Sequence, residues 1–216
     1  MKKVTLVGII VIILMFAIGI YFYQFLPDKL ASHWNAQGQV NGYSSKAFAL
    51  FFMPIITLAL FLLLVFIPKI DPLKQNIRKF SSYYYGFILL FVFYMFYIYI
   101  LTLVSNLGFV INFTQFLSPA MGVLFFCVGI LIEKSKRNWT IGIRTPWTLS
   151  SDFVWKKTHN LGGKLFKISG VICFVGIVLP KYAFFLIIIP VIISAIVSFV
   201  YSYFVYRSEN LLKKKR

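Results

Sequence analysis

Acidic residues are scarce in this sequence, with five Asp and Glu against 22 Lys and Arg in 216 residues. Cysteine and histidine are rarer still, at two each. A catalytic acid–base set, a metal centre and a disulfide framework all need several of these residue types close together. Cys127 and Cys173 each lie inside an apolar run, which is typical of small core residues. We therefore expect no enzymatic activity, no cofactor, no metal site and no disulfide framework.

Long apolar runs dominate the chain, which is 60% hydrophobic and 19% aromatic. A helix needs roughly 20 apolar residues to cross the hydrocarbon core of a membrane. The fifth run is short, and only Pro180-Lys181 separates it from the sixth, which favours a tight helical hairpin. The sequence predicts an all-α, polytopic membrane helix bundle of about six transmembrane helices. The apolar runs are residues 4–26, 47–68, 81–104, 116–132, 165–180 and 184–206.

The Lys and Arg residues predict the orientation of these helices. If the N-terminus is inside, 19 of the 22 basic residues fall on the inner side, and Lys29, Lys46 and Lys181 fall outside. Basic flanks are retained in the cytoplasm during insertion, so both termini are expected there, in a multi-pass protein of the cell membrane. Direct nucleic acid binding is not expected, because the basic residues lie in the gaps between apolar runs rather than on one folded surface.

The outer loop, residues 27–46, is rich in turn-forming residues. Gly38 and Asn41-Gly42 permit positive φ, so a short extended segment or hairpin is predicted there. It would present His33, Trp34 and Tyr43 near the outer headgroups. Two interpretations stay open: a hydrogen-bonded loop with an interface-anchoring tryptophan, or a docking surface for a partner.

The inner loop, residues 133–164, contains three of the four tryptophans. Ser150 or Ser151 can cap a short helix that begins near Asp152. We expect this helix to lie in the membrane interface, with its apolar side chains towards the lipid and two lysines near anionic headgroups. The apolar side chains are Phe153, Val154, Trp155 and Leu161.

Arg144 is the residue of the inner loop with the widest choice of partners. Its planar guanidinium can bridge backbone carbonyls, stack on an indole or receive a partner's carboxylate. A structural clamp and a partner-binding role are equally open.

In the last apolar run, Ser194, Ser198 and Ser202 recur at four-residue spacing, which predicts a face where another helix packs closely.

Both loops carry motifs that resemble those of the SdpI family of bacterial immunity and signal-transduction membrane proteins. The outer loop resembles the N-terminal domain of unknown function found in many members, in Leu26-Pro27, His33-Trp34-Asn35, Gly38 and Gly42-Tyr43. The inner loop resembles the family signature, in Gly142-Ile143-Arg144-Thr145-Pro146-Trp147-Thr148-Leu149, Val154-Trp155-Lys156 and His159. Two parts are therefore expected: residues 1–80, with the outer loop, and residues 81–216, a helical bundle with the inner loop.

The resemblance implies protection of a producing cell from a secreted, membrane-active peptide toxin. It also implies capture of an autorepressor at the cytoplasmic face, so the expected partners are the lipid bilayer, a peptide toxin outside and a transcriptional repressor inside. The partner-binding candidates are His33, Trp34, Asn35, Gly38, Gly42 and Tyr43 outside, and Gly142, Arg144, Thr145, Pro146, Trp147, Thr148, Trp155 and His159 inside.

A small-molecule or peptide transporter is one alternative, and a general cell-envelope stress protein is another. An ion-coupled transport pathway normally needs ionisable residues within the bundle. The apolar runs offer only Lys167, which is expected near a helix end.

Overall fold

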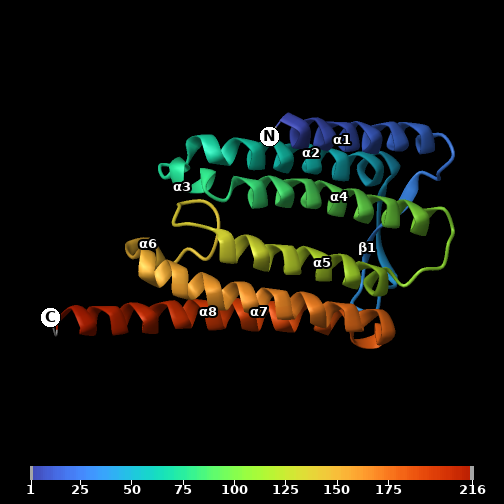
Figure 1. The fold of residues 1–216 in the computed structure, drawn as a ribbon. Coiled ribbons are helices and arrows are strands. Elements are labelled where there is room, and N and C mark those ends of the chain that lie inside the picture. The colour runs from blue at the N-terminus through green and yellow to red at the C-terminus, as the bar shows by residue number, and fades with distance from the viewer. Residues whose placement is uncertain (1, 215–216) are drawn as a thin grey trace.

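Six long helices run the length of the molecule in a computed structural model that describes residues 2–214 (Figure 1). Each is long and apolar enough to cross a membrane, as predicted, so this is a multi-pass membrane protein. The helices are α1 (Lys2–Tyr23), α2 (Lys46–Ile70), α4 (Ser81–Asn106), α5 (Phe113–Lys134), α7 (Asp152–Val178) and α8 (Ala183–Lys214). Short elements connect them, namely α3 (Lys74–Arg78), α6 (Pro146–Ser150) and a 3₁₀ turn, Pro180–Tyr182.

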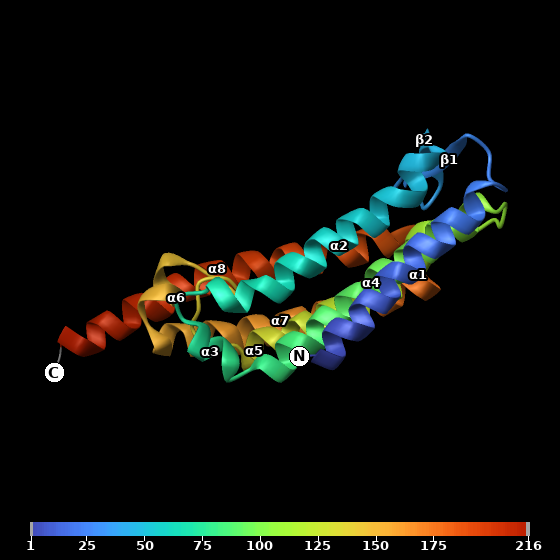
Figure 2. The same cartoon turned by 90° about the horizontal axis from the view of Figure 1, so that it is seen from above.

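A β-hairpin is the exception to the all-helical expectation. Strands β1 (Lys29–Trp34) and β2 (Val40–Ser45) pair antiparallel at one end of the bundle (Figures 1 and 2). The predicted hairpin is therefore confirmed, with Gly38 at positive φ in its turn. Asn41 and Gly42, which also permit positive φ, do not adopt it, because both lie within the extended strand β2.

The two ends of the bundle differ in what they carry. We call the end with β1 and β2 the hairpin end. The opposite end carries α3, α6, the start of α1 and the end of α8, and we call it the termini end (Figure 1). Helix α8, with 32 residues, extends past the other helices there (Figures 1 and 2).

The fifth span is longer than expected. Residues 152–164 were expected to form an interfacial helix separate from the span at 165–180, but α7 is one continuous helix of 27 residues. Val154 and Trp155 are buried within the protein rather than turned towards lipid, while Phe153 is exposed. Gly162 and Gly163 do not end the helix; they lie where neighbouring segments approach closely, with Ser198 of α8 beside Gly162 and the Gly129 carbonyl of α5 beside Gly163.

Paired glycines bring α5 and α7 into backbone contact. A Cβ atom at Gly129 would lie 2.5 Å from the carbonyl oxygen of Gly163, and one at Gly122 would lie 2.8 Å from that of Gly170. Small residues permit this close approach. In lipid there is no hydrophobic driving force between helices, so van der Waals packing of this kind holds them together. Ser118 adds a hydrogen bond of 2.6 Å to the carbonyl of Cys173.

The serine face of α8 packs on α7, as predicted. The hydroxyls of Ser194 and Ser169 lie 2.9 Å apart and are buried. Ser198 faces Gly162, where a Cβ atom would lie 2.9 Å from its hydroxyl. These contacts fix the middle of α8 against α7.

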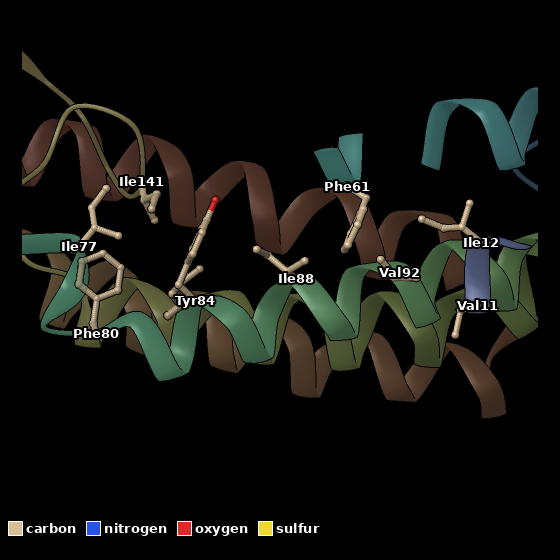
Figure 3. Packing of buried hydrophobic residues seen from close by; sticks show 10 residues of the cluster. Val11, Ile12, Phe61, Ile77, Phe80, Tyr84, Ile88, Val92 and Ile141 are labelled. Atoms are coloured by element: carbon tan, nitrogen blue, oxygen red, sulfur yellow. The ribbon is translucent and has the colours of Figure 1, made fainter. Parts of the chain in front are cut away.

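The N-terminal helices share a second core along α4. The Tyr84 hydroxyl donates to the carbonyl of Leu64 at 2.7 Å, which anchors α2 to α4. Figure 3 shows the row of buried side chains that this core contains. Its members are Val11, Ile12, Phe61, Ile77, Phe80, Tyr84, Ile88, Val92, Leu131 and Ile141.

The α5–α7 contact predicts a large difference between two Gly→Ala variants. In Gly163→Ala, the new methyl group would meet the Gly129 carbonyl oxygen at 2.6 Å, so we expect a loss of about 1–3 kcal/mol in the free energy of unfolding. Thermal unfolding of the detergent-solubilised protein, followed by helical circular dichroism, measures it.

Gly86→Ala is the matched control, because a Cβ atom there meets nothing within 4 Å. It should leave the midpoint of unfolding unchanged or raise it, since Ala is the better helix former. Equal midpoints for the two variants would contradict the proposed backbone contact.

Candidate functional site

The turn of the hairpin is shaped by Asn35. Its side-chain oxygen accepts hydrogen bonds from the backbone N–H groups of Gln37 and Gln39, at 3.0 and 2.9 Å. Gly38 lies at φ +78°, and a side chain there would also collide with Asn112. The sequence motif therefore has a local structural reason at both Asn35 and Gly38.

The hairpin is docked on the loop between α4 and α5. Asn106 accepts from the backbone N–H of Ala31 at 2.7 Å and donates to its carbonyl at 3.0 Å. Trp34 stacks on Phe113 with ring centroids 4.0 Å apart. Asn112 donates to the main chain of the hairpin turn. These contacts join residues about 75 positions apart, so local sequence patterns gave no signal for Asn106, which reads as an ordinary turn residue.

His33 and Tyr43 lie on the exposed surface of the hairpin. His33 Nδ1 is 2.6 Å from the side-chain oxygen of Asn41. Gly42 lies opposite, where a Cβ atom would be 2.9 Å from that of His33. Tyr43 is 68% exposed. The hairpin therefore brings together the six outer candidates of the sequence analysis and leaves these two most accessible.

A cavity of about 450 Å³ lies beneath the hairpin. Ser32, His33, Trp34 and Asn35 of the hairpin line one side of it. The other walls come from α2, α4, α5 and α8, so the cavity joins the two halves of the chain. Their lining residues are Phe48, Ala49, Phe52, Met53, Ile98, Thr102, Phe113, Thr114, Leu117, Met121, Phe184, Ile187 and Ile188.

At the termini end, residues 135–151 form a closely hydrogen-bonded loop, which we call the 135–151 loop. Asn138 is fully buried at its centre. Its side-chain oxygen accepts from the backbone N–H groups of Thr140 and Ile141, and its nitrogen donates to two backbone carbonyls. One buried amide thus organises the first half of the loop.

Asp71 attaches this loop to the end of α2. Its buried carboxylate accepts from the backbone N–H of Leu73 at 2.7 Å and of Trp139 at 3.0 Å, and from the Thr140 hydroxyl at 2.7 Å. Asp71 is not among the residues that the sequence singled out. Its position at the end of an apolar run, in a chain with five acidic residues, was the available signal.

His159 of α7 is buried against the 135–151 loop. The backbone N–H of Ile143 donates to Nε2 at 3.0 Å, and Nδ1 lies 2.8 Å from the Trp155 carbonyl, so the proton resides on Nδ1. Trp155 stacks on the imidazole at 3.9 Å. Gly142, at φ +116°, lies where a side chain would meet His159 Nε2 at 2.5 Å.

The Thr-Pro-Trp-Thr segment caps α6 and fastens it to α8. Thr145 and Thr148 form a reciprocal capping box, with Pro146 in the first turn. The hydroxyls of Thr145 and Ser202 lie 3.0 Å apart. Trp147 packs edge-on against two aromatic rings of α8. The geometry of these residues favours a role in holding α6 in place against α8. Their part in partner binding stays a prediction.

Arg144 is exposed and reaches back into the loop. Its guanidinium donates to the carbonyl of Trp139 at 2.7 Å, as the clamp interpretation expects. The rest of its side chain faces outward, and Trp139 beside it is 53% exposed. These two residues adjoin on the exposed surface of the 135–151 loop, where Lys136, Pro146 and Ser150 are also exposed.

Lys167 lies in the middle of α7 rather than near a helix end, because α7 begins earlier than expected. Its ammonium group pairs with Glu133 of α5 at 2.7 Å.

Within residues 2–214, no group of three His, Cys, Asp or Glu side chains could hold a metal ion.

Comparison with known proteins finds a match in each half of the chain. Residues 134–202 match the model of the SdpI/YfhL protein family, and residues 10–58 match a domain of unknown function, DUF1648. The chain is 26% identical to the immunity protein SdpI of Bacillus subtilis (strain 168), over 97% of this chain and 99% of that protein. No solved structure matches. Each matched region falls within one expected part of the chain, whose boundary at residue 80 stays a prediction.

The hydrogen bonds of the Asp71 carboxylate are expected to restrict the mobility of the 135–151 loop. In Asp71→Ala, the Trp139 amide and the Thr140 hydroxyl lose their acceptor. Hydrogen exchange measured by mass spectrometry should then become faster in peptides that cover residues 138–145.

Asp28→Ala serves as the control, because the Asp28 side chain is almost fully exposed at the hairpin end. Exchange in residues 138–145 should match that of the unmodified protein. A loop that exchanges equally slowly in both variants would show that Asp71 does not hold it.

Proposed function

The chain is a member of the SdpI/YfhL protein family with DUF1648 at its N-terminus, and from this premise we propose that it protects its cell from a secreted, membrane-active peptide. The observation that carries the proposal is the end-to-end similarity to an immunity protein, which covers nearly all of both chains. Similarity of this extent includes both the hairpin and the 135–151 loop, rather than a single shared helix.

The charge distribution supports an outward-facing hairpin end. The structure has Lys29 in β1, Lys46 at the start of α2 and Lys181 in the 3₁₀ turn, all at the hairpin end. These are the three basic residues that were expected outside. The other 19 were expected on the cytoplasmic side. A secreted peptide would therefore meet the hairpin first.

We also propose that the termini end recruits a transcriptional repressor. Arg144 and Trp139 form an exposed pair on a loop whose buried polar side chains, Ser135, Asn138, Thr145 and Thr148, are hydrogen-bonded within the protein. A planar guanidinium beside an indole suits a partner that offers a carboxylate and an apolar side chain. Helix α2 contacts both ends, since it follows β2 directly and its C-cap Asp71 holds the loop.

Expression in a toxin-sensitive cell tests the immunity function. Cells that carry the intact chain should survive culture fluid from the bacterium that encodes it at concentrations that kill cells with an empty vector. Arg144→Ala should protect as well as the intact chain, because it lies at the far end from the hairpin, but should lose retention of the repressor at the membrane. Killing at the same concentration, with the chain verified in the membrane, would refute immunity to that toxin.

Cysteine labelling tests the orientation separately. Tyr43→Cys and Lys136→Cys replace exposed residues at opposite ends, in a background with Cys127 and Cys173 changed to Ala. A membrane-impermeant maleimide added to intact cells should label position 43 alone. Labelling of position 136 instead would reverse the orientation proposed above.

A further inference from the structure

The cavity beneath the hairpin opens sideways. Phe48 and Phe52 of α2 line it, as do Phe184 and Ile188 of α8, and each of these side chains is more than a third exposed. Both helices are long and apolar enough to span the bilayer, so the part of the cavity that lies between them faces lipid. A molecule dissolved in the membrane can therefore enter between α2 and α8 without first crossing water.

The cavity combines apolar walls with one polar side. The walls are mostly aromatic, Leu, Ile and Met side chains, while Ser32, His33 and Asn35 belong to the hairpin. This arrangement suits a ligand that is apolar along its length and polar where it reaches the membrane surface.

Charge distinguishes between two ligands of that kind, a phospholipid and a peptide segment. The residues that line the cavity include no Lys, Arg, Asp or Glu. Nearby Lys46 is already engaged, since its ammonium lies 3.4 Å from Asp28, donates to the Leu26 carbonyl and sits over the Tyr23 ring. A phosphate headgroup would therefore find no cation within the cavity, whereas the amide groups of a peptide suit neutral hydrogen-bonding side chains.

Size limits how much of a ligand the cavity can hold. A volume of about 450 Å³ lies in the range of small-ligand pockets. A whole helix has a diameter of about 10–12 Å and does not fit. The cavity can take a few bulky side chains from one face of a helix that remains in the lipid.

We propose that this cavity is the recognition site for the toxic peptide, and that it takes the bulky apolar side chains of a membrane-inserted segment entering between α2 and α8. The proposal rests on the immunity function above. The polar side chains of Ser32 and His33 would meet the end of the segment at the membrane surface. The hairpin is held in place over the site by Asn106 and by the Trp34–Phe113 stack.

Filling the entrance tests the proposal. Ile188→Trp places a large ring at the mouth between α2 and α8, and Ile193→Trp places the same ring on a lipid-exposed part of α8 that does not line the cavity. Both are compared with the intact chain in toxin-sensitive cells, at equal levels in the membrane, against culture fluid from the bacterium that encodes the chain.

We expect Ile188→Trp to lower the toxin concentration for half-maximal killing by about tenfold, as loss of an anchor pocket would. Ile193→Trp should protect like the intact chain. Equal protection by both variants would overturn the cavity assignment and leave immunity intact, and so would equal loss in both. Failure of the intact chain to protect would overturn the immunity function and, with it, this proposal.

Discussion

Backbone contact between α5 and α7 is the constraint on which the rest of the structure depends. In lipid, apolar side chains gain little by leaving one apolar surface for another, so close packing and hydrogen bonds must hold helices together. Gly122 and Gly129 meet Gly170 and Gly163 in this contact. Because α7 also packs through Gly162 on α8, the pair forms the scaffold against which the 135–151 loop is fixed.

Buried and half-buried polar side chains set the shape of both ends of this scaffold. Asn106 holds the hairpin, and Asn138, Asp71 and His159 hold the 135–151 loop, each through hydrogen bonds to backbone groups. Such groups are expensive to bury unless they are fully bonded, so they favour one arrangement over its alternatives. Two of the loop's residues, Arg144 and Trp139, remain available to a partner. Helix α2 adds a physical link, since it walls the cavity at one end and holds the loop at the other.

The six spans could be predicted because hydropathy is a local property of the sequence, and the hairpin because Gly38 marks its turn. The length of α7 could not, since Gly162-Gly163 ends a helix or lets it pack closely depending on what lies opposite. Asn106 and Asp71 were missed for a related reason. Their partners are 75 and 68 positions away, and no periodic pattern connects them.

The most direct test of peptide recognition at the hairpin end is photo-crosslinking from within the cavity. A benzophenone amino acid at Phe52 faces the mouth, and one at Ile193 faces lipid elsewhere on α8. After irradiation of cells exposed to the toxic culture fluid, mass spectrometry should find an adduct of the secreted peptide at position 52 and not at position 193. An adduct formed equally at both positions, or only with lipid at position 52, would contradict the account.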